Sequence, residues 1–213
     1  MDETIKDYIY NRKPIGKGSF SVVYLGKNKI TNKEVAIKKI SISFDDNVAV
    51  EHIDSEIKIM RKTNHPNIVK LYDHLYDRDG NIYLIMEYCE KGNLSNLLNG
   101  KPLKEKYAQK FMRQIVNALE YLFINKIIHR DIKPQNIMVT NDNVLKLSDF
   151  GFAKFFKDDI DDMSKTICGS PIYMAPEIIM CKTYSNKIDL WSIGVILYEM
   201  IIGKPPYRAN NHI

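Results

Sequence analysis

The 213-residue sequence has few cysteines, no long apolar run and no tract of like charges. Its three cysteines, Cys89, Cys168 and Cys181, are odd in number and lack metal-ligand spacing, which argues against a disulfide framework and favours a reducing compartment. No apolar run approaches the ~18 residues that span a bilayer, and residues 1–4 lack the basic and apolar regions of a signal peptide. We therefore expect a cytoplasmic protein without a membrane span.

The charge of the chain is mildly positive. The formal net charge is +5, but the Lys and Arg residues are scattered among 26 acidic residues. Because the cations form no tract, we expect no nucleic-acid partner and attribute the excess to contacts with anionic nucleotides or phosphopeptides. A hydrophobic content of 45% is enough for the core of one or two domains.

A polar segment at 128–136 lies between two apolar runs that can anchor both of its ends in a core. It contains the pattern H-R-D-x-K-x-x-N, with Asp131, Lys133 and Asn136 at the last three named positions. In the protein-kinase motif of this form, the Asp is the catalytic base and the Asn holds a metal ion. The letters H-R-D also occur by chance in loops, so the interpretation depends on other motifs.

Four further motifs occur in the order found in kinases. They are Met-Glu-Tyr-Cys at 86–89, Asp-Phe-Gly-Phe-Ala-Lys at 149–154, Cys-Gly-Ser-Pro-Ile-Tyr-Met-Ala-Pro-Glu at 168–177 and Asp-Leu-Trp-Ser-Ile-Gly at 189–194. On these motifs the chain resembles a eukaryotic-type Ser/Thr protein kinase, and in particular the autophagy-initiating kinase family. The resemblance runs from about Tyr8 to Tyr207.

The resemblance implies an α+β, bilobal protein-kinase fold. Within a kinase domain at 8–213, residues 8–89 would form the N-lobe and hinge, a small antiparallel β lobe with one helix. Residues 90–213 would form a mainly helical, partial C-lobe. Kinase domains usually continue for several more helices, so we expect this lobe to be truncated and to expose apolar surface that a partner could cover.

Residues 8–39 are alternating and β-branched, which predicts three antiparallel strands. Gly16 and Gly18 could instead belong to a dinucleotide-binding turn, but that turn would require a helix directly after them. The residues that follow, 22–25, favour a strand. The glycines therefore predict a hairpin over nucleotide phosphates, in which Ser21 replaces the third family glycine.

Lys38 ends the apolar run 35–38 and is expected to contact the α- and β-phosphates of ATP, with an exposed strand lysine as the alternative. Apolar residues at helical spacing predict an amphipathic helix over about 50–62. Either Glu51 or Glu56 on this helix could pair with Lys38. The family spacing favours Glu56, and the ion pair would orient Lys38.

Two further strands are predicted at 69–76 and 82–87. They lead to residues that resemble the kinase hinge, which reads adenine, with Met86 as gatekeeper. The ATP-binding set implied by the resemblance is Ile15, Gly16, Lys17, Gly18, Ser19, Phe20, Ser21, Val22, Val23, Ala36, Lys38, Glu56, Met86, Glu87, Cys89 and Met138.

A long buried helix over about 107–122 should lead into the catalytic loop, and a short strand at 144–148 should present Asp149. The resemblance implies that Asp131 is the catalytic base and that Lys133 steadies the γ-phosphate. Asn136 and Asp149 would hold Mg²⁺. Lys133 is the Ser/Thr form of this loop, so we expect protein substrates with a Ser, or less often a Thr, acceptor.

Residues 154–166 are polar and acidic without a period, as expected of a mobile activation loop. By family geometry Thr166 would carry an activating phosphate paired with Arg130, Lys154 and His52. Ser170 would hydrogen-bond across Asp131 and Lys133. An unmodified loop hydroxyl at Thr166 and a simple turn serine at Ser170 are the alternatives.

The run 189–200 is apolar nearly all round, which predicts a buried helix. The resemblance implies that Asp189, at its start, carries the catalytic loop. The chain is thus expected to be an ATP- and Mg²⁺-dependent protein Ser/Thr kinase. The alternative is a catalytically impaired kinase-like fragment that acts as a binding or regulatory module.

Overall fold

The computed structural model describes residues 2–18, 21–41, 47–156 and 168–207. The chain divides into two units. Unit 1 comprises Met1–Thr63 and Val69–Cys89, and unit 2 comprises Asn64–Ile68 and Glu90–Ile213. Three residues that the sequence singled out, Ser19, Phe20 and Thr166, lie outside the described residues.

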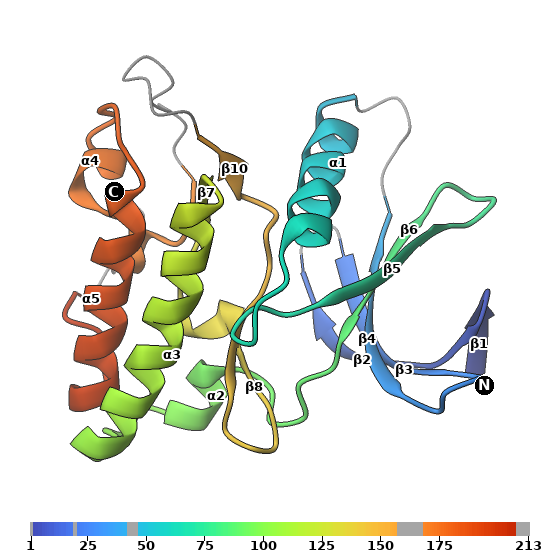
Figure 1. Ribbon diagram of the computed structural model, residues 1–213, viewed down its shortest axis with the longest axis horizontal. Helices are drawn as coiled ribbons and strands as arrows, with labels where there is room; N and C mark the ends of the chain where they lie inside the picture. The colour runs from blue at the N-terminus through green and yellow to red at the C-terminus, as the bar shows by residue number, and fades with distance from the viewer. Residues whose placement is uncertain (1, 19–20, 42–46, 157–167, 208–213) are drawn as a thin grey trace. The chain divides into compact units, whose positions relative to one another are not determined.

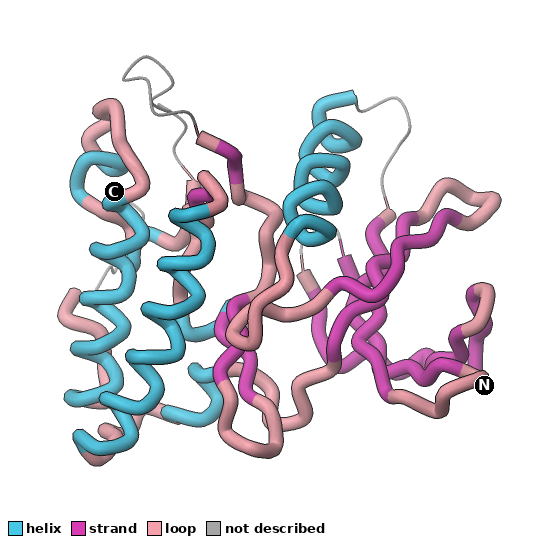
Figure 2. The backbone as a smooth tube through the Cα atoms, in the orientation of Figure 1, coloured by secondary structure: helices cyan, strands magenta, loops and turns pink. Residues whose placement is uncertain are grey.

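A six-stranded antiparallel sheet with the order β1-β2-β3-β4-β6-β5 forms most of unit 1 (Figures 1 and 2). Its strands are β1 (Asp2–Ile5), β2 (Tyr8–Lys17), β3 (Ser21–Asn28), β4 (Glu34–Ile40), β5 (Leu71–Tyr76) and β6 (Ile82–Glu87). The three strands predicted over 8–39 are confirmed, as are the two that follow. The sequence did not predict β1, because its four residues include two acids, which strands disfavour.

Strand β1 is held by contacts with its neighbour. The Tyr10 hydroxyl on β2 donates to the Glu3 carboxylate, and the Arg12 Nε lies 2.9 Å from the same carboxylate. Ile5 packs against an apolar cluster on one face of the sheet, made of Tyr8, Tyr10, Val35, Ile37, Tyr83 and Ile85. These tertiary contacts stabilise a strand that its own residues would not form.

Helix α1 (Asn47–Lys62) completes unit 1 and packs beside β5. Its apolar residues Ile53, Ile57 and Met60 are buried, as their helical spacing predicted. The same face carries Glu56, which is 5% exposed. The amphipathic pattern thus directs one carboxylate into the interior of unit 1.

Unit 2 is mainly helical. Its helices are α2 (Leu94–Leu98), α3 (Glu105–Ile124), α4 (Pro176–Ile179) and α5 (Lys187–Ile202), with short 3-10 turns η1 (Pro134–Asn136) and η3 (Pro171–Tyr173). Figure 1 shows α3 and α5 side by side, in agreement with their contacts. Helix α3 buries Ala108, Phe111, Ile115, Ala118 and Leu122. Tyr107, which we expected on the buried face, is 54% exposed, because it lies one residue before Ala108 and therefore about 100° round the helix from the start of the buried stripe.

Two small antiparallel pairs flank the loop 129–136 of unit 2. β7 (Ile127–Ile128) pairs with β10 (Lys154–Phe155), and β8 (Ile137–Val139) pairs with β9 (Leu145–Leu147). β7 ends directly before His129, and β8 begins directly after Asn136. Both ends of the loop are therefore anchored in buried strands, as the flanking apolar runs predicted.

Helix α5 is buried on one side only, which corrects the prediction of a helix buried all round. Ile188, Asp189, Ser192, Ile193, Val195, Ile196 and Met200 are buried, whereas Leu190, Trp191, Tyr198, Ile201 and Ile202 are exposed. The helix ends at Gly203, whose φ of +86° suits glycine and whose Cβ position would meet Pro102. Among the described residues, no helix combines the length and apolar character that crossing a bilayer requires.

Candidate active site

The loop 129–136 is anchored to the first turn of α5 by hydrogen bonds. The backbone N–H groups of His129 and Arg130 donate to the two carboxylate oxygens of Asp189 at 2.9 and 3.0 Å. Burial raises the pKa of the Asp189 carboxyl, and hydrogen bonds from both N–H groups oppose the rise. Asp189 therefore carries the loop as the resemblance implied, and Arg130 is held at a φ of +69°.

His129 anchors the loop from inside. Its ring is fully buried, lies edge-on to the Phe150 ring, and has Nε2 3.0 Å from the Ser148 carbonyl oxygen. Its Nδ1 accepts from the Asp131 N–H at 3.3 Å. Sequence reasoning assigned no role to His129, although its place in the H-R-D pattern was the available signal. The histidine links the position of Asp131 to the segment that carries Asp149.

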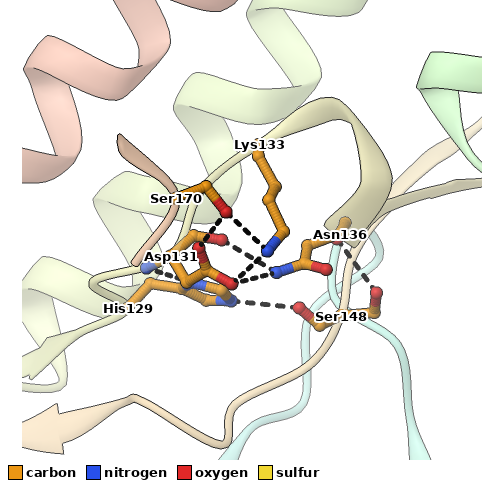
Figure 3. Close-up of polar contacts among 6 residues, drawn as sticks. All are labelled: His129, Asp131, Lys133, Asn136, Ser148 and Ser170. Carbon is orange, nitrogen blue, oxygen red and sulfur yellow. Dashed lines mark hydrogen bonds and ion pairs between the residues drawn. The ribbon is translucent and has the colours of Figure 1, made fainter. Parts of the chain in front are cut away.

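Three side chains meet at the Asp131 carboxylate (Figure 3). The Lys133 ammonium lies 2.7 Å from Oδ2, and the Asn136 amide donates to the same oxygen at 2.9 Å. The Ser170 hydroxyl donates to Oδ1 at 3.2 Å and accepts from Lys133 at 2.8 Å. The hydrogen bonds expected of Ser170 are therefore present. Oδ1 of Asp131 already binds one hydroxyl, so its geometry suits a group that orients or deprotonates an alcohol.

Asn136 and Asp149 are brought together by Ser148. The Ser148 N–H and hydroxyl donate to the Asn136 carbonyl at 2.8 and 2.9 Å. Asp149 follows with a φ of +60°, a region that Asp adopts more readily than most residues. The next residue, Phe150, is fully buried and fixes the segment. The sequence placed these two oxygen donors 13 positions apart, and the fold holds their backbones together.

The donor set suits a magnesium ion that is shared with phosphates. The Asn136 amide nitrogen donates to both the carbonyl and the carboxylate of Asp131, which leaves its side-chain oxygen as the donor for a cation. Within the described ranges, no three His, Cys, Asp or Glu side chains gather as a metal-binding cluster. Mg²⁺ is commonly held by one or two such oxygen donors together with substrate phosphates, so Asn136 and Asp149 could hold it with ATP.

Arg130, the expected receptor of an activating phosphate, contacts two other segments of unit 2. Its Nε donates to the Phe152 carbonyl at 2.6 Å, and its Nη1 donates to the Tyr184 hydroxyl at 3.3 Å. Lys154 lies exposed on β10 of unit 2, whereas His52 lies exposed on α1 of unit 1. Because Thr166 lies outside the described residues, the pairing of its phosphate with these cations stays a prediction. Sequence reasoning missed Tyr184, for which no motif gave a signal.

In unit 1, the strand lysine and the helix glutamate form the expected pair. The Lys38 ammonium lies 2.8 Å from the Glu56 carboxylate, and their side chains are 15% and 5% exposed. Glu51, the other candidate, is exposed. The choice of Glu56 is therefore confirmed. A mostly buried ion pair fixes the lysine more firmly than a surface pair would.

The other described residues of the implied ATP-binding set lie mainly in the hairpin of β2 and β3 and on or beside strands β4 and β6. Gly18 N–H donates to the Ser21 carbonyl at 2.8 Å, and Gly16 pairs with Val23, so the glycines form the expected hairpin between β2 and β3. Ala36 and Met86 are cross-strand partners on β4 and β6. All the described members belong to unit 1 except Met138, which lies on β8 of unit 2.

Comparison with known proteins identifies the family. The sequence model of the protein kinase domain family matches residues 9–213 of the chain. The chain is 43% identical to the serine/threonine-protein kinase atg1 of Dictyostelium discoideum over 97% of its length, and 41% identical to ATG1c of Arabidopsis thaliana over 98%. It is 36% identical to atg1 of Schizosaccharomyces pombe over its whole length. It covers only 28–32% of these relatives' own length. The chain therefore belongs to the protein kinase family and resembles the Atg1 serine/threonine kinases within it.

Proposed function

We propose that the protein transfers the γ-phosphoryl group of ATP to serine, and less often threonine, side chains of protein substrates. The observation that supports this function best is the arrangement around Asp131, where a carboxylate oxygen binds a hydroxyl beside the Lys133 ammonium. The relatives named above carry the name serine/threonine-protein kinase. We place the activity in the cytoplasm, because the few cysteines suit a reducing compartment.

Asp131 orients the substrate hydroxyl and accepts its proton as the new P–O bond forms and the bond from the γ-phosphorus to the bridging oxygen of the departing ADP breaks. Lys133 lies between Asp131 and Ser170, so its ammonium can balance the charge of the transferred phosphoryl group while it fixes the carboxylate. Phosphoryl transfer needs little covalent chemistry from the protein. The contribution of these residues is therefore position and fixed charge.

Asn136 and Asp149 would hold Mg²⁺, which when bound neutralises charge on the ATP phosphates. The Asn136 side chain is oriented for this by its two hydrogen bonds to Asp131. Asp149 is held by the buried ring of Phe150, which follows it in the chain. These residues thus tie the metal donors to the base.

Lys38 would contact the α- and β-phosphates of ATP. Its pairing with Glu56 holds the ammonium at a defined point of β4. With the glycine hairpin of β2 and β3, this pair is the contribution of unit 1 to binding of the ATP phosphates. The alternative function, a binding module without catalysis, would retain nucleotide binding and lack transfer.

The test is transfer of radiolabelled phosphate from ATP to a mixture of protein substrates. The wild type should incorporate label, whereas Asp149→Ala and Asp131→Asn should not. Asp142→Asn, which changes an exposed aspartate in the β8–β9 turn, should behave as the wild type. Equal incorporation by the wild type and Asp149→Ala would overturn the proposed function, and nucleotide binding without transfer would favour the binding module.

A further inference from the structure

The roles proposed above do not use the buried hydroxyl of Tyr184. The Tyr184 side chain is 3% exposed and packs in an apolar cluster with Ile128, Ala175, Ile178 and Ile188. The ring is therefore fixed by the core of unit 2. A buried phenol hydroxyl normally requires polar partners, and the identity of those partners indicates its role.

The partners of this hydroxyl come from two different segments. Arg130 of the catalytic loop donates to it from Nη1 at 3.3 Å. The same hydroxyl donates a hydrogen bond to the sulfur of the buried Cys168, which opposes the rise that burial causes in the pKa of this thiol. A phenol oxygen can accept one hydrogen bond while its O–H is donated elsewhere. Tyr184 can therefore bind Arg130 and Cys168 at the same time.

Cys168 begins a stretch of three residues that lies against the catalytic loop. Gly169 has a φ of +103°, and a Cβ there would lie 2.7 Å from the Arg130 carbonyl oxygen. Ser170 hydrogen-bonds to Asp131 and Lys133. Since the three residues are consecutive, a shift of Cys168 would be passed to the Ser170 hydroxyl.

We propose that Tyr184 is a positioning residue for phosphoryl transfer: its hydroxyl ties Arg130 to Cys168 and thereby sets the place of Ser170 at Asp131. This inference rests on the proposed kinase function and adds a residue to it. Tyr184 acts through residues on the acceptor side of the reaction. Its loss therefore lowers turnover and leaves the affinity for ATP unchanged.

Tyr184→Phe tests this, because it keeps the ring and removes only the hydroxyl. We expect kcat to fall about tenfold, the loss typical of one hydrogen bond to a charged group. The KM for ATP and the thermal midpoint should stay at their wild-type values. The matched control is Tyr198→Phe, which removes a hydroxyl from an exposed tyrosine on α5 and should leave kcat unchanged.

A double-mutant cycle separates positioning from a general structural effect. If the hydroxyl acts through Arg130, Tyr184→Phe should cause no further loss in an Arg130→Met background. The inference would be overturned if Tyr184→Phe lowered kcat by the same factor in both backgrounds, or if it lowered only the affinity for ATP. Wild-type turnover in Tyr184→Phe overturns it while leaving the proposed function intact. No transfer by the wild type overturns both.

Discussion

The hydroxyl of Ser170 lies 3.2 Å from the carboxylate of Asp131, although the two residues are 39 positions apart in the chain. The same hydroxyl accepts a hydrogen bond from Lys133. The end of the activation segment is thus connected to the proposed base by a serine. Because of this contact, the position of the segment that ends at Ser170 and the orientation of the Asp131 carboxylate depend on each other.

Ser170→Ala should lower turnover more than nucleotide affinity. The substitution removes a partner from both Asp131 and Lys133, each of which carries charge in this site. Ser170→Thr retains the hydroxyl and should keep most of the activity. Steady-state kinetics with calorimetric titration of ATP would measure both quantities. A loss seen only in ATP affinity would contradict this role.

Glu56→Gln should weaken catalysis about tenfold or more, because it removes the charge that holds a mostly buried lysine. The matched control is Glu51→Gln on the same helix, where the side chain is exposed. We expect the control to stay within about twofold of the wild type, as surface charges contribute little. The measurement is kcat/KM for ATP. Similar losses in both variants would show that the pairing with Lys38 is not the cause.

Asp189→Asn should destabilise the fold by about 1–3 kcal/mol. Each carboxylate oxygen accepts a hydrogen bond from one backbone N–H, and the substitution replaces one of these oxygens with an NH₂ group that cannot accept. In a protein of this size each kcal/mol lowers the thermal midpoint by about 2–4 °C. Calorimetry would detect the shift, and Asp142→Asn, at an exposed turn, should show none. An unchanged midpoint in Asp189→Asn would mean that the loop does not depend on this anchor.

Thr166→Ala should strongly lower activity if a phosphate on this residue orders the activation segment. A phosphate dianion forms charge-assisted hydrogen bonds with arginine and lysine, and Arg130 and Lys154 are the cations of unit 2 expected to meet it. Thr183→Ala removes an exposed hydroxyl and serves as control. Phosphopeptide mass spectrometry with activity assays would test the switch. Wild-type activity in Thr166→Ala would refute it.

Substrate choice should show no requirement for arginine upstream of the acceptor. The positions that bear carboxylates in arginine-directed kinases are Asn93 and Gln135, both neutral. Asn93 accepts from the Asn96 N–H as the cap of α2, and Gln135 donates to Ser95. A guanidinium would therefore lack a charged partner at either residue, a difference of about 1.5–3 kcal/mol.

A positional-scanning peptide library would measure this preference. We expect an apolar residue just after the acceptor, because by the family pattern the apolar residues Pro171 and Met174 would line the downstream site, as would Ile167, which lies outside the described residues. Phe152, which is 46% exposed, is the bulky residue type that the family pattern associates with serine acceptors, so we also expect serine to be preferred over threonine. A dominant upstream arginine, or a clear preference for threonine, would contradict the prediction.

Local features of this protein followed from the sequence alone. The helical spacing in 50–62 predicted which face of α1 is buried, and the turn residues 77–81 between two strand segments predicted β6 at its observed bounds. The kinase motifs identified Lys38, Glu56, Asp131 and Ser170 as partners before their contacts were known. Such features are predictable because periodicity and motif spacing are properties of short segments.

Other features were decided only by tertiary structure. β1 depends on Tyr10 and Arg12 of the next strand, and its own four residues carry no usable pattern. Helix α5 is apolar nearly all round, so its sequence could not show which side packs against α3. Tyr184 meets Arg130 across 54 positions of sequence. The local sequence around either residue could not predict this contact, because the tertiary fold sets the distance between residues so far apart in the chain.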